Sequence, residues 1–458
     1  MLSKFIGDKA FYRKVMIIVL PIMLQNALTN LVSMVDNIMV GTLGTEQLSA
    51  VAIVNQLLFV FNLAVFGITA GVGIFTAQYY GKGDNDGIRS TVRLKFVLSI
   101  ILLFAAILLF QFAGSFLIES YLHDGDQNMN LELAFAEGKR YLSIMLIGLI
   151  PFVISQVYGG TLREVEKTAF PMVASLIAVA VNLTLNYVFI FSMGLGVAGA
   201  AIATVISRFV ECFAIIIFVA VNKNKSLPFM KGIYSNFVIS SDLVKRVLPK
   251  ALPLLANEFC WSLGIALLNY CYSLRGLDVV AATNITSTIS NLFNVSTISF
   301  GTAISIIIGG LLGAGKIEEA KRTNIKLTFT SFVISIIFGI VLFFASDVFP
   351  QVYNTTPQVK ELASTLIKCY VFYLPMSSLM NSFYFAMRSG GKTVITFLFD
   401  SVYMIFVSVP FTLIIAKLTS IHIIGVYALS LGIEIFKVVL GFILIIQGKW
   451  MQNIVDTE

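Results

Sequence analysis

The chain has 458 residues, of which 58% are hydrophobic and 12% are charged, and its formal net charge is +7. Soluble globular proteins carry about 25% charged residues, so this composition excludes a soluble enzyme, and disorder requires the opposite balance. The basic residues are dispersed among short loops instead of covering one face of a domain, which argues against nucleic-acid binding. The composition predicts a polytopic membrane protein whose long apolar runs cross the bilayer as helices.

Twelve apolar spans are found with a window of about 20 residues, the length that a helix needs to cross a bilayer. In chain order they cover residues 15–40, 48–79, 91–118, 133–158, 168–191, 197–222, 243–273, 279–311, 323–346, 361–387, 393–416 and 423–447. The first span is too long for a cleaved signal peptide and carries Asp36, so we expect it to stay on the chain. The predicted fold class is an all-α membrane protein with twelve transmembrane helices.

Lys and Arg are distributed unequally between the loops on the two sides of these spans. Most of the 31 basic residues fall on the side that holds the N-terminal segment, the loop after span 48–79 and the stretch 222–242. An excess of this kind marks the cytoplasmic side of a membrane protein. We therefore expect a multi-pass protein of the cell (inner) membrane with both termini in the cytoplasm.

An internal repeat appears when the chain is shifted against itself by 232 residues. The shift places Leu20-Pro21 on Leu252-Pro253, Asn62 on Asn294, and the segment 81–83 on 313–315. The same register holds over about 100 residues, which predicts two six-helix lobes related by a pseudo-two-fold axis along the membrane normal, as in parallel-repeat transporters. The expected lobes are residues 1–222 and 243–458, joined by a cytoplasmic linker at 223–242.

Polar residues follow one face of the first span, from Gln25 to Asp36. A carboxylate at the bilayer centre costs about 2.5–3.5 kcal/mol on insertion scales, so Asp36 is a candidate for binding Na⁺ or a proton. Asn182 and Asn186 in the fifth span and Thr204 in the sixth could complete an oxygen shell around Na⁺ or hydrogen-bond a protonated carboxyl. Hydrogen bonding between helices without any ion is the alternative.

The second half supplies a second acid near the middle of a span, Glu258. We expect it to line a substrate or proton cavity with a set of amides from both halves, Gln25, Asn62, Asn269, Asn284 and Asn294. Asp400 is a candidate for a third cavity acid or for a group that faces the cytoplasm. Which acid binds the ion and which binds the substrate stays open.

Two pairs of opposite charges lie within spans at a spacing of three residues, Arg208 with Glu211 and Glu434 with Lys437. Residues three apart are neighbours on a helix, so we expect each pair to be structural.

Cofactor and metal chemistry are poorly supported by this sequence. The four cysteines lie in apolar runs without CxxC spacing, and there are two histidines, so we expect neither a catalytic residue nor a metal beyond Na⁺ at Asp36. The GxG segments 81–83 and 313–315 lack the spacing of a nucleotide-binding loop. We expect a monomer without cofactor or bound nucleotide, in which an ion gradient drives transport.

Three segments together resemble one known family. They are the run 20–41 with the string Met34-Val-Asp-Asn-Ile-Met-Val-Gly41, the segment 77–84 and the tract 196–204. The resemblance is to multidrug and toxic compound extrusion (MATE) transporters, and it covers essentially the whole chain. The resemblance implies a rocker-switch antiporter that exports organic cations or other amphipathic compounds against Na⁺ or H⁺.

The resemblance also assigns roles to individual positions. Asp36 matches the first-helix acid of the family, and Asn182, Asn186 and Thr204 match positions that line its N-lobe cation site. Pro21 matches a first-helix proline linked to bending, with Pro253 as its counterpart in the repeat, and Glu258 resembles the seventh-helix acid. The chain departs from the family in two places, since Asn186 replaces an Asp of one branch and Ser377 stands where some members have a tenth-helix acid.

Two other functions were weighed against export. A flippase for lipid-linked precursors, from a related two-lobe family, would need a cavity rich in Arg and Lys to bind pyrophosphate, and the expected cavity carries acids and amides. A membrane-embedded enzyme would need His, Ser/Lys or paired Asp residues inside the spans.

Overall fold

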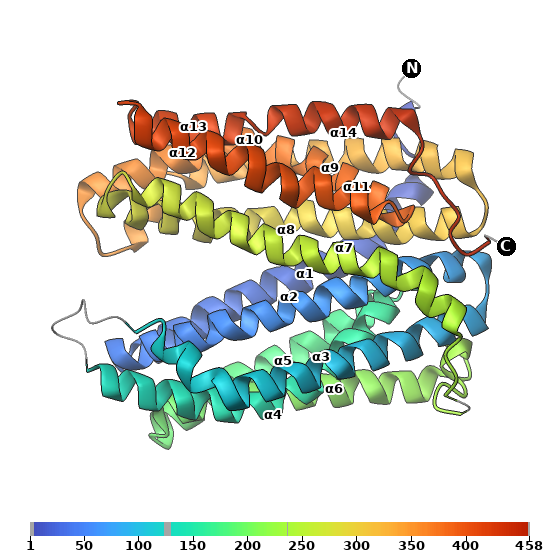
Figure 1. Ribbon diagram of the computed structural model, residues 1–458, viewed down its shortest axis with the longest axis horizontal. Helices are drawn as coiled ribbons and strands as arrows, with labels where there is room; N and C mark the ends of the chain where they lie inside the picture. Colours follow the sequence, from blue (N-terminus) through green and yellow to red (C-terminus); the bar gives the residue numbers. More distant parts are fainter. Residues whose placement is uncertain (1–3, 123–129, 236, 457–458) are drawn as a thin grey trace. The chain divides into compact units, whose positions relative to one another are not determined.

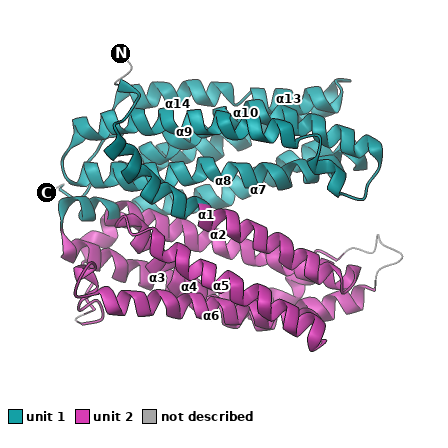
Figure 2. Cartoon of the chain, turned by 180° about the vertical axis from the view of Figure 1, so that it is seen from behind, with its two compact units in different colours: residues 1–23, 77–83, 248–458 teal, residues 24–76, 84–247 magenta. Residues whose placement is uncertain are grey.

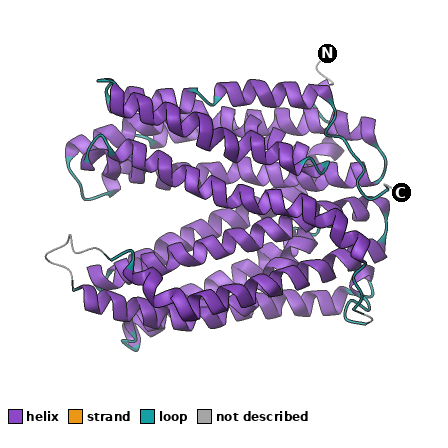
Figure 3. Ribbon diagram, viewed as in Figure 1, coloured by secondary structure: helices purple, strands orange, loops and turns teal. Residues whose placement is uncertain are grey.

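The computed structural model describes residues 4–122, 130–235 and 237–456, and within these ranges every regular element is a helix (Figures 1 and 3). The first half contains α1 (Lys9–Gly41), α2 (Thr45–Lys82), α3 (Asn85–Glu119), α4 (Leu131–Glu164), α5 (Ala169–Asn186), which continues as the π-helix η2 (Tyr187–Ser192), and α6 (Gly196–Asn222). The second half contains α7 (Ser241–Ser273), α8 (Leu277–Gly313), α9 (Ile317–Ala345), α10 (Pro357–Ser389), α11 (Thr393–Phe397), η5 (Leu398–Val402), η6 (Met404–Ser408), α12 (Val409–Leu418), α13 (Ile423–Gly432) and α14 (Ile435–Gln447). The segments η2, η5 and η6 are π-helical, and two 3₁₀ helices are η3 (Pro228–Met230) and η4 (Phe349–Val352).

The twelve predicted spans are confirmed, because twelve helices of the described residues are long and apolar enough to cross a membrane. Several begin earlier than the apolar run. Helix α3 starts at Asn85, six residues before the predicted 91, because the Asp84 side chain accepts hydrogen bonds from the backbone N–H groups of Asp86 and Gly87. A capped first turn of this kind stays helical although its residues are polar, and a hydropathy window does not detect it.

Helices five, eleven and twelve are irregular, the fifth at its end and the other two near their middle. The fifth ends in η2, the eleventh contains η5 and η6, and the twelfth is interrupted between α13 and α14 at Ile433 and Glu434. Turns of π-helix inside longer helices are uncommon and occur frequently at functional sites. In this chain they bring side chains of the second half into contact, as described below.

The chain divides into two compact units (Figure 2). Unit 1 comprises residues 1–23, 77–83 and 248–458, and unit 2 comprises residues 24–76 and 84–247. Helix α1 therefore passes from unit 1 to unit 2 between Met23 and Leu24, and α2 passes back after Thr76. The lobes 1–222 and 243–458 stay a prediction from the repeat.

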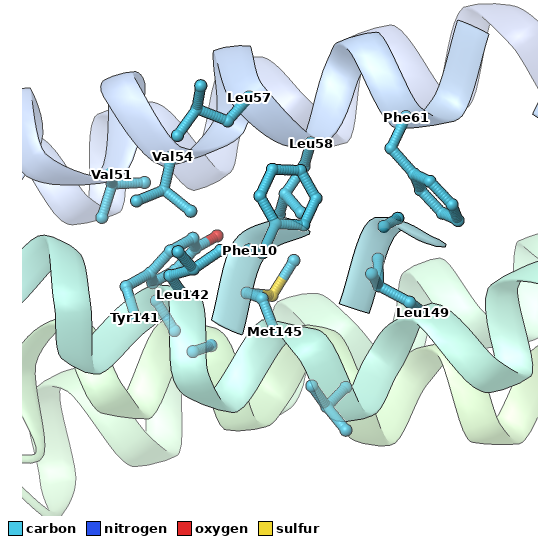
Figure 4. Packing of buried hydrophobic residues seen from close by; sticks show 14 of the residues in the cluster. Val51, Val54, Leu57, Leu58, Phe61, Phe110, Tyr141, Leu142, Met145 and Leu149 are labelled. Atoms are coloured by element: carbon cyan, nitrogen blue, oxygen red, sulfur yellow. The ribbon is translucent and has the colours of Figure 1, made fainter. Parts of the chain in front are cut away.

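The core of unit 2 lies between α2, α3 and α4. Figure 4 shows Val54 and Leu58 of α2 facing Leu142 and Met145 of α4, and all four side chains are at least 95% buried. Phe110 of α3 belongs to the same cluster. In unit 1 a second cluster joins α8, α10 and α13 through residues such as Ala282, Ala363 and Val426.

The end of α2 crosses the end of α8 at glycines inside unit 1. A Cβ atom added to Gly81 would lie 1.8 Å from the carbonyl oxygen of Gly310, and one added to Gly313 would lie 1.9 Å from that of Gln78. Residues 78 and 310, like 81 and 313, are 232 apart, so the two contacts are repeat-related. The crossing requires glycine because the two backbones approach too closely for a side chain.

The last described residues pack on this crossing. Gln78 donates through Nε2 to the carbonyls of Ser389 (2.9 Å) and Gln452 (3.0 Å), and its Oε1 accepts from the N–H of Ile454 (2.8 Å). Trp450 is 3% exposed. The segment after α14 is thereby fixed to the ends of α2 and α10.

The stretch 222–242, expected from its composition to be a polar linker, is partly buried in unit 2; its residue 236 lies outside the described residues. Its apolar side chains Leu227, Phe229 and Ile233 are at most 4% exposed. Arg93 of α3 donates through Nε to the carbonyl of Ile233 (2.8 Å) and through Nη2 to that of Ser235 (2.7 Å). The linker is therefore anchored on α3 and is not a free connection.

Candidate functional site

A polar cluster in unit 2 joins α1, α5 and α6. Asn186 donates through Nδ2 to Asp36 Oδ1 (2.7 Å) and to Asn182 Oδ1 (3.2 Å), and Asn182 lies 3.4 Å from Thr204 Oγ1. Both asparagines are at least 95% buried, whereas Asp36 is half-buried. The structure thus brings together the four residues that the sequence predicts for the coupling-ion site.

The orientation of the Asn182 amide determines the chemistry next to Asp36. With the amide turned by 180°, Nδ2 lies 3.0 Å from Asp36 Oδ1 and 3.3 Å from Oδ2 and can donate to the carboxylate. In the other orientation the amide oxygen faces the carboxylate oxygens. Two acceptors cannot stay in contact without a proton or a cation between them. In addition, the buried Asn186 Oδ1 has no hydrogen-bond partner within the described residues.

The polar stripe on α1 extends from Asp36 to Gln25, a rise of about 16 Å at 1.5 Å per residue. The hydroxyls of Thr29 and Ser33 donate to carbonyls of the same helix at 2.9 and 3.0 Å, and both residues are exposed. Gln25 Oε1 accepts from Arg163 Nη1 at the end of α4 (3.3 Å).

Glu258 of α7 is half-buried, and no hydrogen bond or ion pair joins it to another residue of the described chain. Its neighbour Asn257 is 3% exposed and donates through Nδ2 to Asp400 Oδ2 (3.2 Å) and to the Tyr384 hydroxyl (3.3 Å). Ser401 donates to the Asn257 side-chain oxygen at 2.8 Å. The seventh helix is therefore joined to the eleventh at the residue before the acid.

Asp400 is engaged by a lysine from another helix. Lys437 Nζ lies 2.7 Å from Asp400 Oδ1 and 3.8 Å from Glu434 Oε2. The predicted pair of Glu434 and Lys437 is present, but the shorter contact of Lys437 is with Asp400. Arg208 and Glu211, the other expected pair, form no ion pair within 4 Å among the described residues. Arg208 instead donates to the carbonyl of Gly148 (3.4 Å) and lies over the ring of Phe152 (5.1 Å).

The expected cavity amides have different surroundings. Asn294 Oδ1 accepts from Thr297 (2.5 Å) and from Ser377 (3.4 Å), whereas Asn62 Oδ1 is buried without a hydrogen-bond partner among the described residues. Asn269 and Asn284 are exposed. The sequence analysis did not identify Asn257 or Tyr384. The position of Asn257 next to Glu258 was a signal for the first, and the sequence offered none for the second.

A family model named MatE matches residues 21–188 and 253–416, well over half of the chain. The chain belongs to the MatE family. The two matched segments begin 232 residues apart, which is the register of the internal repeat. Membership of this family makes the chain a multi-pass membrane transporter, not an enzyme.

Curated relatives match along most of their length. A probable multidrug resistance protein NorM of Thermotoga maritima is 24% identical over 446 residues, which cover 96% of this chain and 93% of the relative. A protein of the same name from Oceanobacillus iheyensis is 26% identical over 377 residues, covering 78% of this chain and 79% of the relative.

Solved structures share the fold. The crystal structure of a MATE protein in the straight conformation superposes with a TM-score of 0.87 at 20% identity, covering 100% of this chain and 99% of that chain. The outward-facing conformation of a multidrug resistance MATE family transporter gives a TM-score of 0.86 at 20% identity, with 98% of both chains covered.

Proposed function

We propose that this chain is an antiporter that exports organic cations and other amphipathic drugs in exchange for Na⁺ or H⁺, and that Asp36 binds the coupling ion. The observation that carries the proposal is the cluster of Asp36 with Asn182, Asn186 and Thr204 on three helices of unit 2. The multidrug resistance names of the relatives support the substrate class.

The cluster suits a monovalent cation or a proton because it gathers one carboxylate, two amide side chains and a hydroxyl within one unit. Na⁺ would bind to Asp36, to the oxygen of Asn182 in the orientation that faces the carboxylate, and to Thr204. A proton on Asp36 would instead donate to the same amide oxygen. Without a bound ion, Nδ2 of Asn182 can donate to the carboxylate instead.

Alternating access by a rocker switch requires that part of the chain bends. Pro21 lies inside α1, two residues before the point at which the helix passes from unit 1 to unit 2, and Pro253 lies inside α7. Proline removes a helical hydrogen bond and weakens the helix locally. Related MATE structures are described in a bent and in a straight conformation, which supports bending at Pro21.

We propose that the substrate contacts in unit 1 come from Glu258, which has no ion pair among the described residues, and from the amides Asn269, Asn284 and Asn294. The contacts expected of Gln25 and Asn62, which belong to unit 2, stay a prediction from the sequence. A half-buried carboxylate attracts a cationic substrate, and Glu258 forms no ion pair within 4 Å among the described residues, although the charge of Arg388 also acts on it. We propose that the protein acts as a monomer in the cell (inner) membrane. The distribution of Lys and Arg supports a cytoplasmic position for both termini.

The test replaces Asp36 with Asn in purified protein reconstituted in liposomes. A Na⁺ gradient and a pH gradient are imposed separately, with a fluorescent organic cation as the reporter. We expect Asp36→Asn to abolish gradient-driven export in a folded, inserted protein. Ser33→Ala is the matched control, because its hydroxyl bonds to the Thr29 carbonyl of its own helix, and it should retain export. Unimpaired export by Asp36→Asn would overturn the proposal.

Thr204→Val distinguishes the two coupling ions, because it keeps the shape of the side chain and removes an oxygen. If Na⁺ is the coupling ion, the variant needs a several-fold higher Na⁺ concentration for half-maximal export. If the proton is the coupling ion, the variant keeps the pH dependence of the unmodified protein, because the proton requires a single acceptor beside Asp36.

A further inference from the structure

A second polar cluster lies in unit 1 on the helices that correspond, in the repeat, to those of the Asp36 cluster. The first cluster uses the first, fifth and sixth helices of its half. The second uses α7 with Asn257, the eleventh helix with Asp400, and the twelfth with Glu434 and Lys437. The same three helices of each half therefore carry acids and amides, but the second cluster also contains an ammonium group.

The ammonium of Lys437 is enclosed by groups that suit a cation. The residue is 5% exposed, and its Nζ contacts Asp400 Oδ1 (2.7 Å) and Glu434 Oε2 (3.8 Å). It lies over the rings of Phe399 (5.4 Å) and Tyr403 (6.0 Å), and aromatic faces attract cations.

The remaining carboxylate oxygens of the cluster are also hydrogen-bonded. Asp400 Oδ2 accepts from Asn257, and Glu434 Oε1 accepts from the hydroxyl of Ser408. Each of the four carboxylate oxygens therefore has a partner among the described residues. A buried carboxylate is stable only when it is paired and hydrogen-bonded in this way.

The irregular helices produce this arrangement. Asp400 lies in η5, Ser408 ends η6, and Glu434 lies in the interruption between α13 and α14. The Tyr403 hydroxyl donates to the carbonyl of Ile433 (2.8 Å), which compensates for the interrupted helix. The irregularities therefore aim side chains of two helices at one point, where the ammonium lies.

We propose that Lys437 is a fixed counter-ion that replaces an exchangeable cation in the second half of the transporter. An ammonium that is covalently attached to the chain cannot dissociate, so Asp400 and Glu434 take no part in ion exchange. This assignment rests on the proposed function only in its comparison with the Asp36 cluster. Lys437 is thus a positioning residue that holds Asp400 against Asn257, the residue before Glu258.

The test is chemical rescue of Lys437→Ala by methylammonium, measured as the melting temperature of the purified protein in detergent. Truncation removes the ammonium and leaves room for a small cation beside Asp400. We expect Lys437→Ala to melt below the unmodified protein and to regain part of the loss as methylammonium chloride is added. Tetramethylammonium chloride at equal ionic strength is the control, since it is too large and cannot donate hydrogen bonds.

A double variant separates a counter-ion from a residue that only fills space. Asp400→Asn with Lys437→Ala lacks the carboxylate that would bind methylammonium, so it should not respond. Equal responses of the single and the double variant, or no response of the single variant, would overturn the proposal. If Lys437→Ala does not fold, Lys437→Met is used instead, and adding Asp400→Asn should raise its melting temperature because it removes the unpaired carboxylate. A melting temperature that does not rise would contradict a counter-ion role.

Export by two further variants of Lys437 provides a second measurement. Lys437→Arg keeps a positive charge and should keep export, whereas Lys437→Met should make export depend on Na⁺ concentration more strongly than in the unmodified protein. Unchanged Na⁺ dependence in a folded Lys437→Met protein counts against the proposal. The rescue experiment involves unit 1 alone, so a protein with both Asp36→Asn and Lys437→Ala should be rescued as well as Lys437→Ala. Failure of the proposed function at Asp36 can therefore be distinguished from failure of the counter-ion role of Lys437.

Discussion

The buried ion pair between α3 and α4 allows a quantitative prediction about stability. Lys95 is 0% exposed, and its Nζ donates to Glu164 Oε2 and to Thr161 Oγ1 (3.3 Å). Gly73 of α2 makes room for the acid, since a Cβ atom there would lie 2.0 Å from Glu164 Oε1. Replacing Lys95 with Met keeps the apolar stem and removes the charge, so that Glu164 is left without its counter-ion.

The expected loss follows from the burial of both groups. Removing one partner of a buried ion pair costs about 3–5 kcal/mol, because the remaining charge is uncompensated, whereas replacing both partners with neutral residues is often close to neutral. We therefore expect Lys95→Met to lower the free energy of unfolding by about 3–5 kcal/mol. Adding Glu164→Gln to Lys95→Met should recover most of this loss.

Denaturant titrations in detergent, followed by circular dichroism, measure the free energy of unfolding of the two single variants and the double variant. A double-mutant cycle isolates the interaction between Lys95 and Glu164 from changes in packing. The reasoning fails if Lys95→Met is as stable as the unmodified protein, or if the double variant is no more stable than Lys95→Met.

Three further predictions concern the crossing of α2 and α8 and the segment that packs on it. Gln78→Ala leaves buried groups without partners, at about 1–3 kcal/mol for each, and should speed hydrogen exchange at the Ile454 N–H (2.8 Å from Gln78 Oε1); unchanged exchange would contradict this. Gly313→Ala should lower the melting temperature, because the new Cβ would lie 1.9 Å from the Gln78 carbonyl, whereas Gly432→Ala, which meets nothing within 4 Å, should not; equal effects would disprove the role of the crossing. The hydrogen bond from Lys82 holds the pKa of Asp456 below its ordinary value of 3.8, so the contribution of this ion pair is present above pH 3.8 and lost as the pH falls through the lower folded pKa. Proteolysis of the terminal segment should therefore accelerate only in that acidic range, and an onset near neutral pH would refute the assignment.

The sequence was sufficient for the twelve spans because each depends on the sum of many apolar residues, which no single contact decides. It was less informative at the helix ends. The N-terminal turn of α3 is polar and is held by the Asp84 cap, and the π-helical turns in the eleventh helix depend on tertiary contacts. Hydropathy records neither of these features.

The polar clusters show a similar limit in predicting which side chains contact each other. Glu434 and Lys437 were paired from their spacing of three residues, a rule that considers neighbours on one helix. The closer partner of Lys437 is Asp400, 37 residues away in the chain, and no spacing rule reaches it. By contrast, the grouping of Asp36 with Asn182, Asn186 and Thr204 was proposed from the polar residues within the spans and matched by the family resemblance, and the structure brings these side chains together.

The repeat provides a similar group of helices in each half, and the side chains on these helices decide whether the half has an exchangeable site. Duplicated halves place equivalent helices in equivalent positions. The first, fifth and sixth helices of each half can therefore enclose a cation. In the first half the enclosing groups comprise one acid, two amides and a hydroxyl, without a Lys or Arg in hydrogen-bonding contact with Asp36 among the described residues. In the second, Lys437 supplies the charge from the protein itself. If Lys437 is the fixed counter-ion that we propose, the difference between the halves lies in one ammonium group, and moving the ion cycle to the second half would require its removal.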